Sequence, residues 1–330
     1  MTNKAHFDVL VIGNPCVDIV FGGMPHWPVL GQEMYVNKFG ISAGGIFNTA
    51  ATLSRLGLRV ALLCELGNDF FSRFMLEEIE KAGVCSDLVL RRDHPMFSVS
   101  VCLAHESERG FVSYSNTQDG IVAHLLEKTS PGEADGEEAD IVEYVVAHDP
   151  SILLADYTFS AVFIYARPTM LPLANYVVER ASVLFYDTGW HPQELLDPCM
   201  PTVVKRGNYI MPNQMEATLM TSTGSAEEAV CKLAEWAPTA IVKKGAQGVV
   251  ACQQGELLYC DAYPIHEVVD TTGAGDAFNG GFIYGILKGY ELLEALRCGT
   301  ICGSLSTTAL TGTAAVPTAE ELERLRRCTY

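Results

Sequence analysis

The chain has 330 residues, of which 48% are hydrophobic and 19% are charged, a composition typical of a soluble globular protein with a large core. Its formal net charge of −18 argues against a general binder of nucleic acids or of anionic membranes, because such a surface repels both. We expect no signal peptide, and no apolar run is long enough to span a bilayer. The 11 cysteines form no disulfide framework and no zinc pattern, so we expect a reducing, cytoplasmic location.

Short apolar runs alternate with helical patterns through most of the chain. We expect strands over residues 7–13, 60–64, 152–155, 183–187, 209–211 and 240–243. We expect helices over residues 47–56, 70–82, 170–181 and 226–236. This alternation predicts an α/β fold, a doubly wound, mostly parallel sheet with helices on both faces. We expect a single domain over residues 1–330, with ligands at the carboxyl ends of the strands.

Two stretches interrupt the alternation. Residues 25–42 and 96–115 are extended and more polar, and together they predict a small antiparallel sheet that projects as a lid. A pair of ordinary edge hairpins is the alternative that the pattern leaves open. Residues 127–143 form an acidic insert with Pro and Gly, which we interpret as a solvated surface segment without chemistry.

Two candidate binding motifs lie in the N-terminal part of the chain. Asp18 follows the first expected strand, where a carboxylate can accept hydrogen bonds from sugar hydroxyls, although a turn residue is as good an interpretation. Gly44 and Gly45 precede an expected helix and let the backbone approach a ligand closely. Asn48, one turn into that helix, offers both a donor and an acceptor. A helix start with a polar first turn explains the second motif equally well.

Two further motifs lie after the strands expected near residues 210 and 242. Asn213 followed by Glu216 fits a capping box, in which the pair stabilises a helix start. It also fits a carboxylate that holds Mg²⁺ through water near the phosphates of a nucleotide. Lys243, Lys244 and Gly245 end the later strand, where a lysine can neutralise phosphate, although a lysine here is more often solvated.

The run DTTGAGDAFNGGF, which starts at Asp270, carries the strongest functional signal. Its turn, Gly273, Ala274 and Gly275, stands where backbone N–H groups and a helix N-terminus can converge on an anion. Asp276, in the first helical turn, would stand beside the same anion. An anion hole with a positioned base is the apparatus of phosphoryl transfer to a hydroxyl group. A capped turn without chemistry is the weaker alternative.

The segments on both sides of this turn complete the pattern. We interpret residues 266–269 as the end of a strand and residues 278–287 as a helix. Gly280, Gly281 and Gly285 lie inside that helix, where each costs about 1 kcal/mol relative to Ala. They indicate close backbone approach to a neighbouring element or to a ligand.

Other nucleotide-binding and hydrolytic motifs are missing from the sequence. The chain has no Gly-x-x-x-x-Gly-Lys-Ser/Thr run, so any nucleotide is held without a Walker A loop. The eight histidines show no metal-ligand spacing and no partner serine in a nucleophile elbow. Hydrolase and zinc-enzyme interpretations are therefore weak.

Taken together, these motifs resemble the PfkB/ribokinase family of sugar and nucleoside kinases. The resemblance covers nearly the whole chain, and the run from Asp270 to Gly281 is its most specific element. Further matching segments are VIGN at 11–14, AGGIFN at 43–48, LG at 56–57, LGNDF at 66–70, NQME at 213–216, TG at 311–312 and Pro317.

The resemblance implies ATP-dependent transfer of the γ-phosphoryl group to a hydroxymethyl group. By similarity, Asp276 is the general base, and the backbone of Gly273, Ala274 and Gly275 forms the anion hole. The implied substrate-binding residues are Asp18, Gly44, Gly45 and Asn48. The implied nucleotide-binding residues are Asn213, Glu216, Lys243 and Gly245, of which Glu216 holds Mg²⁺ through water.

The resemblance also implies a cation site and an interface. Asp270 and the carbonyl group of Thr272 are similar to the family's monovalent-cation site, which is usually filled by K⁺. The two polar extended stretches are similar to the family's β lid, which often mediates formation of a homodimer.

Departures from the family pattern concern the substrate. The ribokinase branch typically has a Lys after the paired glycines, where this chain has Ile46. Many hexose and keto-deoxy-sugar kinases carry Asp-x-Asn-x-Arg, where this chain reads DTGWH at residues 187–191. Without that Arg, a carboxylated or phosphorylated substrate loses its fixed cation. Cys16 and Phe47 suggest a pocket with one apolar wall, which suits a neutral sugar or a nucleoside.

We therefore expect a Mg²⁺-dependent kinase that uses ATP to phosphorylate a small neutral sugar. A nucleoside kinase of the same family is the main alternative. A sugar-binding sensor that kept the fold but lost turnover is an alternative of a different class. The intact Asp276 and anion-hole sequence argue against the sensor.

Overall fold

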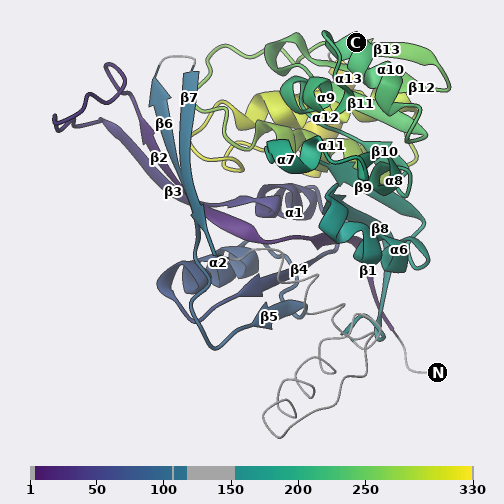
Figure 1. The fold of residues 1–330 in the computed structure, drawn as a ribbon, viewed down its shortest axis with the longest axis horizontal. Coiled ribbons are helices and arrows are strands. Elements are labelled where there is room, and N and C mark those ends of the chain that lie inside the picture. Colours follow the sequence, from purple (N-terminus) through teal and green to yellow (C-terminus); the bar gives the residue numbers. More distant parts are fainter. Residues whose placement is uncertain (1–3, 106–107, 117–152, 329–330) are drawn as a thin grey trace, which may run out of the picture.

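A large mixed sheet forms the centre of the molecule in the computed structural model, which describes residues 4–105, 108–116 and 153–328 (Figure 1). Its strands, in spatial order, are β13 (Glu256–Cys260), β12 (Val249–Gln253), β11 (Thr239–Lys243), β10 (Tyr209–Ile210), β9 (Val183–Asp187), β8 (Tyr157–Tyr165), β1 (Ala5–Ile12), β4 (Val60–Leu66) and β5 (Val89–Arg91). The strands from β5 to β11 run parallel, whereas β12 and β13 are antiparallel additions at one edge.

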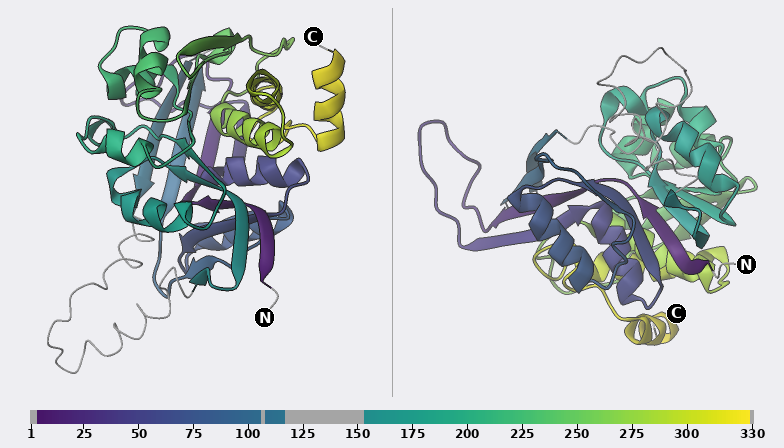
Figure 2. Two further views of the ribbon diagram at one scale, coloured as in Figure 1. Left: turned by 90° about the vertical axis from the view of Figure 1, so that its right-hand side faces the viewer. Right: turned by 90° about the horizontal axis from the view of Figure 1, so that it is seen from below.

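Helices cover both faces of this sheet, as expected. They are α1 (Ile46–Arg55), α2 (Phe70–Lys81), α6 (Leu171–Val178), α7 (Pro192–Leu195), α8 (Met200–Val204), α9 (Gln214–Thr221), α10 (Ala226–Leu233), α11 (Ala274–Leu287), α12 (Leu292–Ser306) and α13 (Ala319–Cys328), with 3₁₀ turns η1 (Pro168–Met170) and η2 (Gly245–Gln247). Figure 2 shows α1, α11 and α12 on one side of the sheet and α6 to α10 on the other. Because both faces are covered, a central strand can be buried along its whole length, and every residue of β4 is buried. The predicted α/β fold is confirmed.

A smaller sheet projects from the main one, and we call it the lid. Its strands lie in the order β3 (Lys38–Gly45), β2 (Pro15–Gly22), β6 (Ser98–His105) and β7 (Glu108–Ser115). It is mixed rather than antiparallel, because β2 and β6 run parallel. The expected segment 96–115 supplies β6 and β7, but residues 25–37 of the other expected segment form no strand. The lid takes β2 instead, which follows β1 after only Gly13 and Asn14.

Three local predictions are wrong. In the strand expected at 152–155, residue 153 is helical and residues 154–155 form a turn, and the strand is the following aromatic and β-branched run, β8. Residues 266–269 are irregular rather than the end of a strand, because Val269 donates its N–H to the Thr307 carbonyl group instead of to a strand. Asp18 lies inside β2 rather than after a strand. The acidic insert expected at 127–143 lies outside the described residues.

The glycines inside α11 serve helix packing. A Cβ atom on Gly280 would lie 2.4 Å from Thr52 Cγ2 of α1, and one on Gly281 would lie 2.5 Å from the Cys298 carbonyl oxygen of α12. A Cβ atom on Gly285 would lie 2.7 Å from Ala295 Cα. Of the two explanations for these glycines, a neighbouring element is therefore the one that the structure supports.

Candidate active site

Two cavities flank the turn that begins α11, and Thr271 lines both of them. The larger cavity, about 480 Å³, lies between the end of β11, the loop after β13, and helices α11 and α12. The smaller cavity, about 370 Å³, lies between the same turn, Gly45, Asn48 and the lid. Lys243 is the last residue of β11, so the larger cavity opens at the carboxyl end of a strand, where α/β folds bind ligands.

The turn between the cavities is held in a shape that requires glycine. Gly273 has φ +73° and is the N-cap of α11. A Cβ atom there would lie 2.7 Å from Gly312 Cα and 2.9 Å from Asn48 Nδ2. The position therefore excludes residues other than glycine for two reasons, its positive φ and the lack of space for a side chain. Gly273 lines the smaller cavity, while Ala274 and Gly275 line the larger one. The positive end of a 14-residue helix is thus placed between the two cavities.

Asp276 lines the smaller cavity from the first turn of α11. Its Oδ2 accepts a hydrogen bond from Asn48 Nδ2 at 3.4 Å, and its backbone carbonyl group accepts one from Thr49 Oγ1 at 3.3 Å. Burial, followed by the negative charge of Asp187, raises the pKa of Asp276 from 3.8 to about 7, although Lys243 and Asn48 oppose the rise. A carboxylate with a pKa near neutrality is suited to general base catalysis.

A charged cluster stands behind this turn. Lys243 Nζ donates to Asp187 Oδ2 at 2.7 Å and to Asn279 Oδ1 at 3.2 Å, and Asn279 Nδ2 donates to Asp187 Oδ2 at 2.5 Å. A Cβ atom on Gly275 would lie 3.4 Å from Lys243 Nζ, so the ammonium group reaches the back of the turn. No motif in the sequence predicted a role for Asp187 or Asn279. Two features of the sequence could have indicated a role for them: Asp187 ends β9, and Asn279 lies one helical turn after Asp276.

Asp18 is buried in β2 and faces the smaller cavity. Burial raises the pKa of Asp18 from 3.8 to about 6, while a hydrogen bond from Cys16 Sγ at 3.4 Å opposes the rise. A Cβ atom on Gly44 would lie 1.8 Å from Asp18 Oδ2. Gly44 therefore makes room for this carboxylate and does not itself line the cavity, whereas Gly45, with φ +62°, does.

The lid completes the smaller cavity with hydroxyl groups that the sequence analysis missed. Ser100 on β6 pairs with Asp18 on β2 and with Ser113 on β7, and the hydroxyl groups of the two serines are 2.8 Å apart. Because directly opposed residues share a face of a sheet, these side chains form one polar row across the lid. Phe111, two residues before Ser113 on β7, lies on the same face of the lid and adds an aromatic ring to this wall. Serines at alternating positions in residues 98–115 were the signal.

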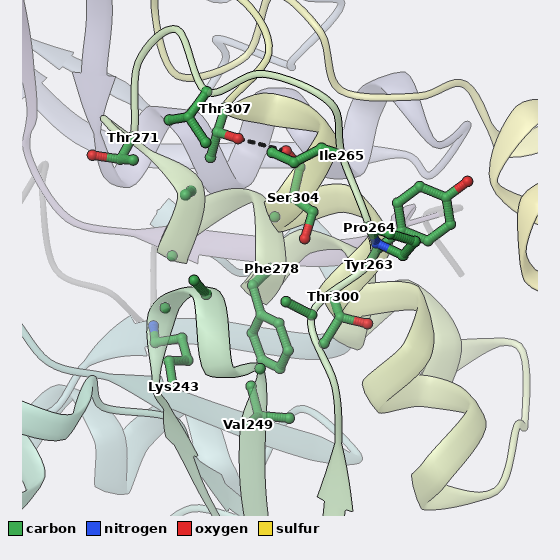
Figure 3. A pocket seen from close by; sticks show the side chains of 18 residues that line it. Lys243, Val249, Tyr263, Pro264, Ile265, Thr271, Phe278, Thr300, Ser304 and Thr307 are labelled. Atoms are coloured by element: carbon green, nitrogen blue, oxygen red, sulfur yellow. Dashed lines mark hydrogen bonds between the residues drawn. The ribbon is translucent and has the colours of Figure 1, made fainter. Parts of the chain in front are cut away.

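The larger cavity is mainly apolar apart from Lys243 and a few hydroxyl groups (Figure 3). Val249 and Phe278 lie together at one end, and Pro264 and Ile265 line it from the loop after β13. Gly245 also lines it, with φ +59° and open space around its missing side chain. An apolar slot beside a helix N-terminus and a lysine fits a planar base next to phosphate groups.

The structure shows the capping box that the sequence left as one of two interpretations. Asn213 Oδ1 accepts the N–H of Glu216 at 3.0 Å, and Glu216 Oε2 accepts the N–H of Asn213 at 3.0 Å. Thr188 Oγ1 also donates to Glu216 Oε2 at 2.7 Å. Burial and the negative charge of Asp187 raise the pKa of Glu216. Neither capping residue lines the larger cavity.

Asp270 stands just before the turn and is 1% exposed. Its Oδ1 accepts the N–H and the hydroxyl group of Thr272 at 3.0 and 2.8 Å, and its Oδ2 accepts the N–H of Thr311 at 3.1 Å. Arg109 of the lid places Nε 3.6 Å from Oδ1. The carboxylate that the sequence predicts to hold a monovalent cation therefore already faces a positive charge of the protein.

Comparison with known proteins identifies the family. The model of the pfkB family carbohydrate kinases matches residues 8–319.

The chain belongs to the pfkB family.

A ribokinase of Bacillus subtilis is 24% identical over 96% of this chain and 99% of its own length. The structure of Arabidopsis thaliana ribokinase complexed with ribose and ATP is similar, with a TM-score of 0.74 at 20% identity, covering 98% of this chain and 99% of that chain. The Burkholderia thailandensis nucleoside kinase in complex with inosine gives a TM-score of 0.75 at 19% identity, covering 97% of this chain and 98% of that chain.

The pfkB family consists of carbohydrate kinases, so this chain is a phosphotransferase with an alcohol group as acceptor. Membership also confirms the ribokinase-like fold and supports ATP with Mg²⁺ as cofactors. Among the described residues, no helix is long and apolar enough to cross a membrane.

Proposed function

We propose that the chain is a single kinase domain, residues 1–330, that transfers the γ-phosphoryl group of ATP to a hydroxymethyl group of a small neutral sugar. One observation carries the proposal: Asp276 lies at the N-terminus of α11, at the boundary between a cavity suited to a nucleotide and a cavity lined with hydroxyl groups.

In this proposal Asp276 takes the proton of the attacking hydroxyl group. Its raised pKa supports that role, because a base with a pKa near neutrality accepts a proton readily and is still ionised in a substantial fraction of molecules at cellular pH. Negative charge that develops on the transferring group faces the backbone of Gly273, Ala274 and Gly275, where the dipole of α11 stabilises it. Lys243, held behind Gly275, adds a positive charge to the same side of the turn.

The larger cavity is the proposed ATP site. The base lies against Val249, Phe278 and Pro264, and the phosphates extend past Gly245 toward the turn. Mg²⁺ keeps several waters and suits one or two nearby carboxylates plus phosphates. We assign that role, through water, to Glu216 with Asn213 beside it, because Glu216 lies close to Asp187 and Lys243 at the carboxyl ends of β9 and β11. Mg²⁺ supplies charge neutralisation on the phosphates when bound.

The smaller cavity is the proposed sugar site. Asp18 accepts hydrogen bonds from sugar hydroxyl groups, and Asn48 can both donate and accept them. Gly45 lets the backbone approach the substrate closely. Ser100 and Ser113 extend the polar row over the substrate. Among the described residues that line this cavity, none is Lys or Arg. A carboxylated or phosphorylated sugar would therefore enter without a cation to pair with and would face the charge of Asp18.

A nucleoside is the second candidate substrate, and a specific observation favours it. Phe111 lines the smaller cavity on the same face of the lid as Ser113, and its ring is one against which a base can stack. The inosine complex of a protein with the same fold supports this alternative. The two classes separate on one variant: Phe111→Ala weakens binding of a nucleoside much more than binding of a sugar.

A homodimer through the lid is proposed from its outer surface. Phe39 and Ile41 on β3 and Val112 on β7 are large, exposed apolar residues of the lid. Covering them removes apolar area from water. Sedimentation velocity of the full chain tests this, and a monomer at micromolar concentration contradicts it. The cytoplasmic location stays a prediction.

The decisive experiment is a coupled ADP-release assay with ATP and Mg²⁺ on neutral sugars, sugar acids, sugar phosphates and nucleosides. Turnover on a neutral sugar that falls about 10²–10⁴-fold in Asp276→Asn supports the proposal. Asp93→Asn, which changes an exposed carboxylate that lines neither cavity, is the matched control. Near-wild-type turnover of Asp276→Asn overturns the role of the base, and turnover only on charged sugars overturns the substrate class.

A further inference from the structure

Arg109 connects the lid to the catalytic turn. It lies on β7, opposite Ala104 of β6, and its side chain is 10% exposed. Its Nε is 3.6 Å from Asp270 Oδ1, and the Asp270 side chain is 1% exposed. A guanidinium group that is nearly removed from water needs a compensating negative charge, and Asp270 supplies it.

The contacts of Asp270 show what this ion pair controls. One carboxylate oxygen accepts two hydrogen bonds from Thr272, the residue just before Gly273. The other accepts the N–H of Thr311, a β-branched residue with φ +79°, a conformation that persists only where neighbouring groups hold it. Gly312 follows, and its Cα lies 2.7 Å from the position of a Cβ on Gly273. Asp270 therefore fixes both chain segments that shape the anion-hole turn.

These contacts leave little for a monovalent cation to do at this carboxylate. Three protein hydrogen bonds already use acceptor positions of Asp270, out of about four that a carboxylate has. A metal ion at the same carboxylate would stand within a few ångströms of the guanidinium group, and two like charges at that distance repel. The residues present therefore do not fit the K⁺ site that the sequence predicts.

We propose that Arg109 is the resident cation of this site, so that the kinase turns over without bound K⁺. The positive charge of Arg109 stabilises the carboxylate of Asp270, which in turn holds Thr272 and Thr311 by hydrogen bonds. A bound ion would have the same effect. Arg109 lies on β7, so the positive charge comes from the lid, the same sheet that forms one wall of the smaller cavity. Arg109 is thus a positioning residue for the turn. This inference rests on the proposed kinase function, but part of its test does not.

The first measurement compares turnover in KCl, NaCl and N-methyl-D-glucamine chloride at equal ionic strength. Wild type and Lys38→Ala, which removes an exposed cation at the edge of the same sheet, are expected to give equal rates in all three salts. Arg109→Ala is expected to lose activity in N-methyl-D-glucamine and to regain about tenfold in K⁺, a coupling of ordinary size. Arg109→Lys, which keeps the charge, should show little response to K⁺.

The second measurement is thermal unfolding in the same salts without any substrate. An ion that binds only the folded state raises the melting temperature. We expect Arg109→Ala to melt at a higher temperature in K⁺ than in N-methyl-D-glucamine, and wild type to show no such difference. This result stands even if no substrate of the panel is turned over, so failure of the proposed function and failure of this inference are distinguishable.

Two outcomes overturn the inference. Wild-type turnover or wild-type melting temperature that depends specifically on K⁺ shows that an ion binds beside Arg109. An Arg109→Ala protein that is impaired but indifferent to K⁺ in both measurements shows that Arg109 only fastens the lid.

Discussion

Asp276→Asn is expected to stabilise the protein while it removes activity. The pKa of Asp276 is about 7 in the folded chain against 3.8 ordinarily, because burial and the charge of Asp187 disfavour its ionised form. The unfolded chain therefore loses its proton first as pH rises. The folded state is penalised progressively between pH 3.8 and about 7, and the penalty is constant above that.

The size of the penalty follows from the shift. Each unit of pKa corresponds to 1.36 kcal/mol, so ionised Asp276 costs at most about 4 kcal/mol at pH 8. Asparagine has nearly the same shape and carries no charge at any pH. The variant should thus be more stable than wild type at pH 8 by about 2–4 kcal/mol, and the difference should shrink toward pH 5.

Urea unfolding followed by circular dichroism at several pH values between 5 and 8.5 measures this difference. Asp93→Asn, at an exposed position, should show almost none at any pH. A difference that does not change with pH, or a wild type that is the more stable protein at pH 8, would refute the reasoning from burial. Activity lost together with stability would instead indicate a damaged fold.

Three other predictions use different parts of the site. The acidic limb of the pH profile of kcat/KM should have its midpoint near pH 7. Asp187→Asn should move this midpoint to lower pH, and Lys243→Met should move it to higher pH. A common midpoint in all three proteins would contradict the assignment of the limb to Asp276. Gly44→Ala should reduce kcat/KM by more than about tenfold, mainly through KM, because the new methyl group meets Asp18, the carboxylate that we propose to bind substrate. Gly22→Ala in the same sheet is its control, and equal kinetics of the two would refute it. Gly280→Ala should lower the free energy of unfolding by about 1–3 kcal/mol, measured by thermal unfolding, because its Cβ would lie 2.4 Å from a side chain of α1. Unchanged stability would show that α1 and α11 can move apart without cost.

The parts of this fold that the sequence predicted well are those fixed locally. The turn around Gly273 and the start of α11 are set by glycines and by a helix pattern within a few residues, so both are visible in a linear reading. The strands of the parallel core are short apolar runs for the same reason. The missed strand, β8, was hidden because another apolar pair of residues, Leu153 and Leu154, lies shortly before it in the sequence.

The parts that could not be predicted depend on contacts between distant segments. Asp187 and Asn279 are 92 positions apart and meet at 2.5 Å only because β9 and α11 pack together. Arg109 reaches Asp270 from the lid, a part of the fold that is distant from Asp270 in the sequence. Asp18 was placed after a strand, because a polar residue in a short apolar stretch resembles a turn until β2 is paired on both edges.

The charge of the smaller cavity also bears on how a catalytic cycle ends. Within the described lining, Asp18 and Asp276 are the ionisable acids, and no Lys or Arg opposes them. For the neutral sugar that we propose as substrate, the reactant carries no charge, whereas the product would be a phosphate ester with nearly two negative charges. We therefore expect repulsion by these carboxylates to favour release of the product, and we expect inhibition by accumulated sugar phosphate to be weak.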